Sequence, residues 1–330
     1  MFDFGYGLAK RLKAAGVIGI NRRNAVYMLP YNRRSLYPLV DDKVRTKELA
    51  RAAGVAIPEL YGLVEIQQQV AGVGALVAGR EDFVVKPAQG SGGEGIVVVT
   101  GRSGRHYRLA DGSTMDEHDL AFHVSNILSG TYSLGGQSDR ALLEYRVRFD
   151  PVFEMISFRG VPDVRIIVFL GVPVMAMVRL PTRLSGGKAN LHQGAIGAGI
   201  DIATGRTLTA VWRNAVVSEH PDTLNPVSGV EIPNWPRLLD IAARSWEMTG
   251  LGYQGIDIVL DRDLGPLVLE LNARPGLNIQ IANREGLAPR LEAVERNRDR
   301  LKTVEDRIAY AVENFRSNPG VPPSSAPSAG

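Results

Sequence analysis

Two carboxylates and an amide near the end of the chain are the residues best placed to do chemistry. Asp257 lies in the apolar run 255–259, and the run Leu269-Glu270-Leu271-Asn272 follows it. Because strand side chains alternate between two faces, Glu270 and Asn272 point to one side, and a hairpin partner brings Asp257 beside them. Magnesium favours such oxygen ligands together with waters and phosphate oxygens. We therefore predict a magnesium site, whereas a solvated hairpin face would explain any one of these residues alone.

A cation follows these residues directly. Arg274 lies two positions beyond Asn272 and shares its face if the strand continues. There it would neutralise charge on a transferring phosphoryl group or an acyl phosphate. The alternative is a simple ion pair with a surface carboxylate.

A glycine-rich loop, residues 89–95, lies between two expected strands, 81–87 and 96–100. It lacks both the Walker pattern and the Rossmann pattern, each of which leads into a helix. Glycines let several backbone N–H groups approach an anion closely, so the loop is suited to cover phosphates. Lys86 ends the apolar strand before it, and a buried ammonium requires an anionic partner. Phosphate would serve as that partner.

The elements that must position these residues can be read from periodicity and from capping residues. We expect an N-terminal helix within 2–15 and a helix over 43–53 that begins at Asp41 or Asp42. Asn234 is the expected N-cap of another helix. The remaining expected elements are a helix over 115–128, a strand over 141–147, a hairpin of 164–170 and 172–180 turning at Gly171, a helix over 235–249, and a second hairpin of 253–260 and 266–272.

Composition narrows the class of protein. The 330 residues include no cysteine and five histidines, so oxygen ligands are expected for any metal. The net charge of +3 is spread along the chain, which argues against a nucleic-acid partner. There is no apolar run of membrane-spanning length and no signal-peptide pattern, so we expect a cytoplasmic α/β protein. The Pro- and Ser-rich tail, 317–330, is expected to be disordered.

Taken in order, these motifs resemble the ATP-grasp superfamily: Asp42-Lys43, Val85-Lys86-Pro87 with the glycine loop, Leu143-Glu144-Tyr145, and Asp257 with Glu270-Leu271-Asn272. The resemblance covers about residues 40–283. It is greatest to the RimK-like group, the alpha-L-glutamate ligase-related and sugar-transfer-associated ATP-grasp proteins. The segments that carry it are Pro162-Asp163-Val164-Arg165, the run 188–194 and the run 265–272.

The resemblance implies an α+β ATP-grasp fold in which two α/β lobes with antiparallel sheets clasp ATP. It implies that Lys43 and Lys86 contact the nucleotide phosphates and that Ser91, Gly92 and Gly93 close over them. It also implies that Glu144, Tyr145 and Val147 lie at the adenine. The implied ligands of two magnesium ions, or of manganese, are Asp257, Glu270 and Asn272. Arg165 would stabilise the γ-phosphate or the acyl phosphate, and Asn190 and Arg274 would lie near the reacting centre. His192 is either a catalytic residue or a hydrogen-bonding loop residue. Either Asp150 or Glu154 would bind the ribose.

The chain departs from the family pattern before Lys43. Only 42 residues precede it, fewer than a complete pre-grasp domain, so we expect a truncated pre-grasp region at 1–42. The first lobe with the glycine loop follows at 43–147, and the second lobe with the magnesium site at 148–316. Arg22, Arg23, Arg33 and Lys188 could present cations to an acidic substrate in place of the pre-grasp domain. A homodimer or a partner subunit could also complete the pocket.

The activity implied is that of a carboxylate–amine ligase. A substrate carboxylate attacks the γ-phosphorus of ATP, and an amine, for example in glutamate ligation, then displaces phosphate from the acyl phosphate. Two alternatives keep the same nucleotide site. One is a kinase that phosphorylates a sugar or another small-molecule hydroxyl, and the other is a non-catalytic nucleotide-binding scaffold.

Overall fold

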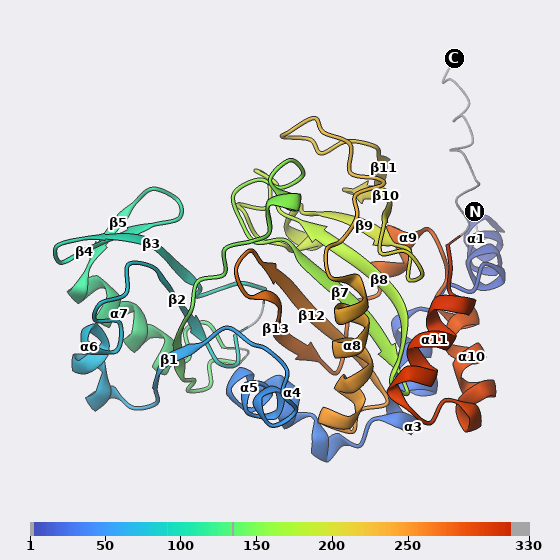
Figure 1. The fold of residues 1–330 in the computed structure, drawn as a ribbon, viewed down its shortest axis with the longest axis horizontal. Coiled ribbons are helices and arrows are strands. Elements are labelled where there is room, and N and C mark those ends of the chain that lie inside the picture. Colours follow the sequence, from blue (N-terminus) through green and yellow to red (C-terminus); the bar gives the residue numbers. More distant parts are fainter. Residues whose placement is uncertain (1–2, 91, 134, 318–330) are drawn as a thin grey trace.

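The computed structural model describes residues 3–90, 92–133 and 135–317, and its strands form two sheets (Figure 1). Every strand pairing among these residues is antiparallel, which agrees with the expected α+β class. None of the helices in the described ranges is long and apolar enough to cross a membrane. The predicted tail falls outside the described residues except for Ser317.

The small sheet has the strand order β1-β6-β2-β3-β4-β5. Its apolar residues pack against the helix α7, whose N-cap Asp116 accepts a hydrogen bond from the backbone of Asp119. The elements of this lobe are β1 (Leu60–Val64), α6 (Val73–Leu76), β2 (Phe83–Pro87), β3 (Val97–Ser103), β4 (His106–Leu109), β5 (Thr114–Asp116), α7 (Glu117–Leu128) and β6 (Ala141–Glu144). Strands β4 and β5 were not predicted, because their short runs are polar.

The large sheet has the order β11-β10-β9-β8-β7-β12-β13, and α8 and α11 lie across one of its faces (Figure 1). Its strands are β7 (Asp163–Phe169), β8 (Val172–Leu180), β9 (Ile196–Ile200), β10 (Thr207–Trp212), β11 (Ala215–Val217), β12 (Tyr253–Asp261) and β13 (Gly265–Asn272). The helices around it are α8 (Trp235–Thr249), α9 (Ile279–Asn283), α10 (Ala288–Asn297) and α11 (Val304–Asn314). Both predicted hairpins are confirmed.

The turn between β7 and β8 shows why that hairpin was predictable. Leu170 and Gly171 both adopt positive φ, 49° and 76°, as a two-residue turn with the favoured twist requires. The helix α8 has the predicted bounds, but Asn234 at its N-cap position has φ 57° and makes no side-chain capping bond.

The segment before Lys43 packs on the large lobe. It contains α1 (Asp3–Ala14), α2 (Ile20–Arg22), α3 (Leu29–Tyr31) and α4 (Pro38–Asp41), and α5 (Lys43–Ala52) follows. Tyr27 and Tyr31 meet Phe169 edge to face, with ring centroids 5.6 and 5.0 Å apart. Asn32 exchanges two hydrogen bonds with the backbone of Tyr253, at 2.7 and 2.8 Å. These residues therefore belong to the core of the large lobe.

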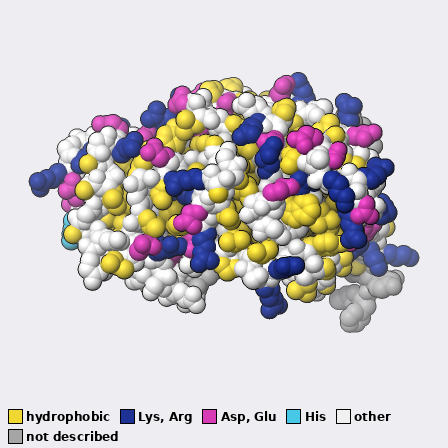
Figure 2. All heavy atoms as spheres, turned by 60° about the horizontal axis from the view of Figure 1, so that its bottom comes forward, with side chains coloured by type: hydrophobic (Ala, Val, Ile, Leu, Met, Phe, Trp, Pro, Cys, Tyr) yellow, Lys and Arg dark blue, Asp and Glu magenta, His cyan; other side chains and the backbone are white. Residues whose placement is uncertain are grey.

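The surface carries charges of both signs. On the face shown in Figure 2, Lys and Arg side chains are interspersed with Asp and Glu side chains and with hydrophobic ones. This agrees with the small net charge of +3.

Candidate active site

The three predicted magnesium ligands lie together on one face of the large sheet. Asp257 on β12 pairs directly with Glu270 on β13, and Gly255 pairs with Asn272. Asp257 is also opposite Arg165 on β7. Because directly paired residues of an antiparallel sheet share a face, this register places the two carboxylates, the amide and the guanidinium side by side.

Two arginines hold the buried carboxylate of Asp257. Arg165 donates from Nε and Nη2 to its two oxygens at 2.7 and 2.5 Å, and Arg179 donates at 2.8 Å. Arg179 also makes a bidentate pair with Asp163, at 2.5 and 2.7 Å. Burial by itself would raise the pKa of Asp257, but the two guanidinium groups hold that pKa well below its usual value. Asp257 is therefore an ionised carboxylate in this cluster.

Sequence reasoning missed Arg179. A signal was available, because a hairpin that turns at Gly171 brings Arg179 opposite Asp163, one of the residues quoted for the resemblance. A cation in the apolar run of β8 requires an anionic partner.

The side chains of this cluster fit a magnesium ion. The amide nitrogen of Asn272 lies 3.3 Å from Asp257 Oδ2 and 3.3 Å from Glu270 Oε1, so it lies between the two carboxylates. Rotating the amide by half a turn replaces its nitrogen with its oxygen and completes a set of three oxygen donors. Among the described residues no three His, Cys, Asp or Glu side chains cluster so that they could hold a metal, so the candidate donor set consists of the two carboxylates and the Asn272 amide.

The predicted phosphate lysines are joined by a third lysine. Lys86 lies 2.5 Å from Glu144 Oε1, and Lys47 lies 2.8 Å from Glu144 Oε2; all three side chains are buried. Glu144 is therefore an anionic partner of Lys86 in this structure, and the contact of Lys86 with phosphate stays a prediction. The Glu144 carboxylate pairs with two ammonium groups in this structure, and its predicted place at the adenine stays a prediction. Lys47 was not predicted.

Lys43 contacts the glycine loop. Its ammonium donates to the carbonyl oxygen of Gly90 at 2.7 Å. Burial holds the pKa of Lys43 below its usual value; the negative charge of Glu270 opposes this shift, and the positive charge of Lys86 adds to it. The pKa of Lys43 therefore depends on charged residues of both sheets.

Backbone contacts place the predicted adenine residues. The amide of Tyr145 donates to the carbonyl of Glu59 at 2.8 Å, and the Tyr145 hydroxyl donates to Asp261 at 3.1 Å. Val147 packs with Val259 and Leu267, and Tyr145 and Leu269 lie against them. These residues form an apolar wall beside β13.

The glycine loop touches the second lobe. Gln193 donates to the carbonyl of Gly92 at 3.4 Å, and Lys188 pairs with Glu94 at 2.9 Å. Gly92 and Gly93 have φ of 66° and 79°, which favours glycine. Ser91 lies outside the described residues. The glycine loop thus faces a second glycine-rich stretch, residues 185–199, across the lobes.

Asn190 and His192 lie on this second stretch. The Asn190 side chain accepts a hydrogen bond from the backbone of His192 at 3.0 Å and so caps the short turn Leu191–Gln193. His192 is exposed and lines a cavity of about 450 Å³.

Three other predicted residues, Arg274, Asp150 and Glu154, have partners outside the carboxylate cluster. β13 ends at Asn272, so Arg274 does not continue its face; the Arg274 guanidinium instead stacks on Tyr37, 4.6 Å from the ring centroid, and lies 3.8 Å from Asp41. The surface ion pair left open for Arg274 is therefore the arrangement observed. The two ribose candidates also have partners, because Asp150 accepts from the amide of Val152 and Glu154 pairs with Arg262.

Two arginines of the N-terminal turn are engaged within the large lobe. Arg22 pairs with Glu292 at 2.7 Å, and the buried Arg23 donates to the carbonyl of Pro275 at 2.8 Å. Both arginines therefore have partners within the large lobe, and their predicted contact with an acidic substrate stays a prediction. Arg33 is exposed and stays a candidate.

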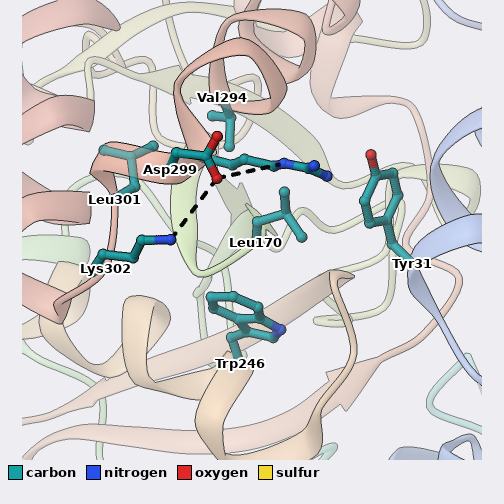
Figure 3. A pocket seen from close by; sticks show the side chains of 8 residues that line it. Tyr31, Leu170, Trp246, Val294, Asp299, Leu301 and Lys302 are labelled. Atoms are coloured by element: carbon teal, nitrogen blue, oxygen red, sulfur yellow. Dashed lines mark ion pairs between the residues drawn. The ribbon is translucent and has the colours of Figure 1, made fainter.

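A second cavity, of about 320 Å³, lies beside the β7–β8 turn (Figure 3). Tyr31, Leu170 and Trp246 line it. The two cationic side chains in its wall, Arg298 and Lys302, both pair with Asp299, at 4.0 and 3.9 Å. Leu170, the first residue after β7, lies five residues from Arg165, which is roughly 17 Å at the usual rise of a strand. This cavity is therefore separate from the carboxylate cluster.

Comparison with known proteins identifies the family. No curated protein matches the chain. Among solved structures, the ATP-grasp ligase PsnB with its minimal precursor is 18% identical, with 81% of this chain and 63% of PsnB covered and a TM-score of 0.44. This chain thus spans less than two thirds of PsnB. The D-cycloserine synthetase DcsG is 16% identical, with 90% and 80% covered and a TM-score of 0.45. The family model described as sugar-transfer associated ATP-grasp matches residues 22–296. The chain therefore belongs to the sugar-transfer associated ATP-grasp family.

Proposed function

We propose that this protein is an ATP-dependent ligase that activates a carboxylate as an acyl phosphate and joins it to an amine. The observation that carries the proposal is the convergence of Arg165 and Arg179 on the carboxylate of Asp257, with Glu270 3.9 Å from Arg165. Cations beside paired carboxylates suit a reaction that moves a charged phosphoryl group. The narrower identification with RimK-like glutamate ligases stays a prediction.

In this proposal, ATP lies between the lobes. Lys43 and Lys86 contact its phosphates while the loop with Gly92 and Gly93 covers them. The apolar wall of Val147, Val259 and Leu269 takes the adenine, together with backbone groups of Glu144 and Tyr145. Asp257, Glu270 and Asn272 would hold magnesium, which supplies positive charge to the phosphate oxygens.

The first step forms a bond between a carboxylate oxygen of the substrate and the γ-phosphorus. The bond from that phosphorus to the β–γ bridging oxygen breaks, and ADP leaves with the electron pair. Arg165 and Lys86 offset the charge that spreads over the phosphoryl oxygens. Arg165 must exchange part of its contact with Asp257 for the phosphoryl group, which a bound cation at Asp257 would favour.

In the second step, the nitrogen of a neutral amine attacks the acyl carbon. The C–N bond forms, the C–O bond to phosphate breaks, phosphate leaves with that electron pair, and the nitrogen releases one proton. Contact of Gly92 and Glu94 with Gln193 and Lys188 keeps water from the acyl phosphate. Asn190 and His192 lie on the segment nearest this step.

The test is incubation of the full chain with ATP, magnesium and a panel of amino acids and dipeptides. We expect amine-dependent release of ADP and free phosphate, with a product mass equal to acid plus amine minus water. A product that retains phosphate would replace the ligase with a kinase. The absence of amine-dependent ADP release across the panel would contradict the proposal.

A further inference from the structure

The 450 Å³ cavity lies on the same face of the large sheet as the carboxylate cluster. Val211 lines the cavity and pairs with Gly197, which pairs in turn with Arg179. Two strand spacings separate Val211 from Arg179, roughly 10 Å. Gly197 has no side chain of its own, and Leu191 lies above it, because a Cβ at Gly197 would come within 2.8 Å of Leu191. The cavity therefore borders the site of the proposed reaction, with the Leu191 side chain at the boundary.

Part of its wall is apolar and exposed. Leu184 and Ile281 are 57% and 47% exposed, and Leu191 is partly buried beside them. Large hydrophobic side chains gathered at a cavity are typical of a site that takes an apolar group.

Two polar side chains of the wall, Gln193 and Arg213, each carry a group without a polar partner among the described residues. The side-chain oxygen Oε1 of Gln193 is buried and accepts no hydrogen bond from the described residues. A buried acceptor without a donor costs free energy, which an N–H group of a ligand would recover. On the other side, the Arg213 guanidinium lies over the ring of Trp212, 5.9 Å from its centroid, and forms no ion pair within the described ranges.

The backbone beneath Arg213 is unusual. Arg213 and Asn214 form the turn between β10 and β11 with φ of 49° and 65°. A turn with two left-handed residues favours Asn and Gly, and a long side chain at its first position is disfavoured. The fold nevertheless places an arginine there, at the edge of the cavity.

We propose that this cavity binds the amine substrate, and that this substrate is an amino acid or short peptide with an apolar side chain and a free carboxylate. Its amine donates to Gln193, its carboxylate pairs with Arg213, and its side chain packs on Leu184 and Ile281. This proposal rests on the proposed ligase activity. The contact of Gln193 with Gly92 then connects amine binding to closure of the glycine loop.

The test begins with equilibrium binding, which does not require turnover. The full chain, with magnesium and a non-hydrolysable ATP analogue, is titrated in a calorimeter with L-leucine, L-phenylalanine and L-leucyl-L-leucine, with the amide of each, and with glycine. We expect at least one of the three acids to bind, and its amide and glycine to bind at least tenfold more weakly, because a charge-assisted hydrogen bond and an apolar contact are lost.

Arg213→Gln should weaken binding of the acid at least tenfold and leave binding of the amide unchanged. Arg105→Gln, which removes the same charge from an exposed position on the small lobe, should change neither. Leu184→Ser and Ile281→Ser should reduce the preference for the apolar acid over glycine. In turnover, Arg213→Gln should raise the KM for the amine with little change in kcat.

The proposal is overturned if none of the three acids binds, or if Arg213→Gln leaves their binding unchanged. These outcomes are distinct from failure of the ligase. Amine-dependent ADP release that is insensitive to Arg213→Gln keeps the ligase and removes this cavity as its amine site. Binding as expected without any amine-dependent ADP release keeps the cavity as a binding site and removes the ligase.

Discussion

Glu144 is the residue on which the nucleotide side of the site depends most. Its carboxylate lies between the ammonium groups of Lys47 and Lys86, and the three residues are 3%, 3% and 6% exposed. Burial by itself would raise the pKa of Glu144, but the two ammonium groups lower it below its usual value. Burial lowers the pKa of Lys47 to about 8 against the opposing charge of Glu144. Each charge is therefore tolerated only because the others are present.

Replacing Glu144 with Gln should lower the free energy of unfolding by about 3–5 kcal/mol, because two buried cations lose their anion. Urea denaturation of the wild type and the variant measures the difference. Glu59→Gln is the matched control, since its pair with Arg80 spans 3.7 Å between exposed side chains and should matter by less than about 1 kcal/mol. Equal losses of unfolding free energy in the two variants would contradict a stabilising role of the buried Glu144 charge.

Glu270 offers a test of the magnesium site with little effect on folding. Its side chain is 35% exposed, and its closest cation, Arg165, is 3.9 Å away. Glu270→Gln should therefore leave the free energy of unfolding within about 0.5 kcal/mol. It should lower kcat/KM at least about 100-fold and raise the magnesium concentration needed for activity, because a ligand is lost. Unchanged magnesium dependence would exclude Glu270 as a ligand.

At the scale of elements, the sequence was informative where a strand pair had a short, well-marked turn. The hairpins at Gly171 and at 262–264 were predictable because long apolar runs flank them, and their register brought Asp257 beside Glu270 as expected. Strand β9 was missed because two of its five residues are glycines, and β11 because it has only three residues; the β-prone run of β10 was a signal that sequence reasoning did not use. The end of β13 at Asn272 was not predicted, although the Pro275-Gly276 pair that follows is a turn signal, and the predicted role of Arg274 stays a prediction.

The glycine loop is anchored by helix α7 through His123. Its Nε2 lies 3.0 Å from the carbonyl of Gly95, and its Nδ1 lies 3.4 Å from the Tyr132 hydroxyl. A neutral ring satisfies both contacts, with Nε2–H as donor and Nδ1 as acceptor. Burial holds the pKa of His123 below its usual value of 6.5, against the hydrogen bond to Gly95.

This shift predicts how stability depends on pH. The unfolded chain binds the proton more readily than the folded protein, so the free energy of unfolding should fall as pH drops below about 6.5 and until the folded pKa is passed. Urea denaturation at pH 7.5 and at pH 5.5 measures the loss. His123→Gln should make it smaller, whereas His118→Gln, at an exposed position of the same helix, should not. The same pH dependence in both variants would show that His123 is not responsible.

At the scale of the whole molecule, the two lobes meet through side chains that lie about 100 residues apart in the chain. Lys188 pairs with Glu94, with separation 94, and Gln193 contacts Gly92, with separation 101. Spacing within either stretch gives no sign of such contacts. The resemblance placed both stretches near the nucleotide, and the structure adds which residues touch.

Reversing one charge of this pair should weaken closure over ATP. Glu94→Lys alone should raise the KM for ATP a few-fold at low salt, since two cations then face each other, and the double variant with Lys188→Glu should restore it. Because both side chains are exposed, the effect should shrink at high ionic strength. Steady-state kinetics at two salt concentrations would measure it, and a double variant as impaired as the single one would contradict the pairing.

The N-terminal segment has a consequence for synthesis of the chain. The core of the small lobe comes from one continuous stretch, 64–143, whereas the large lobe needs Ile18 beside Gln280 and Asn32 beside Tyr253. Asn32 and Tyr253 are 221 positions apart, so Tyr253 is synthesised roughly 10–45 s after Asn32 at ribosomal speed. Tyr27 and Tyr31 lack Phe169 during the earlier part of that interval and Tyr253 throughout it, while the small lobe can already fold. The nascent large lobe therefore exposes aromatic side chains until its later strands emerge.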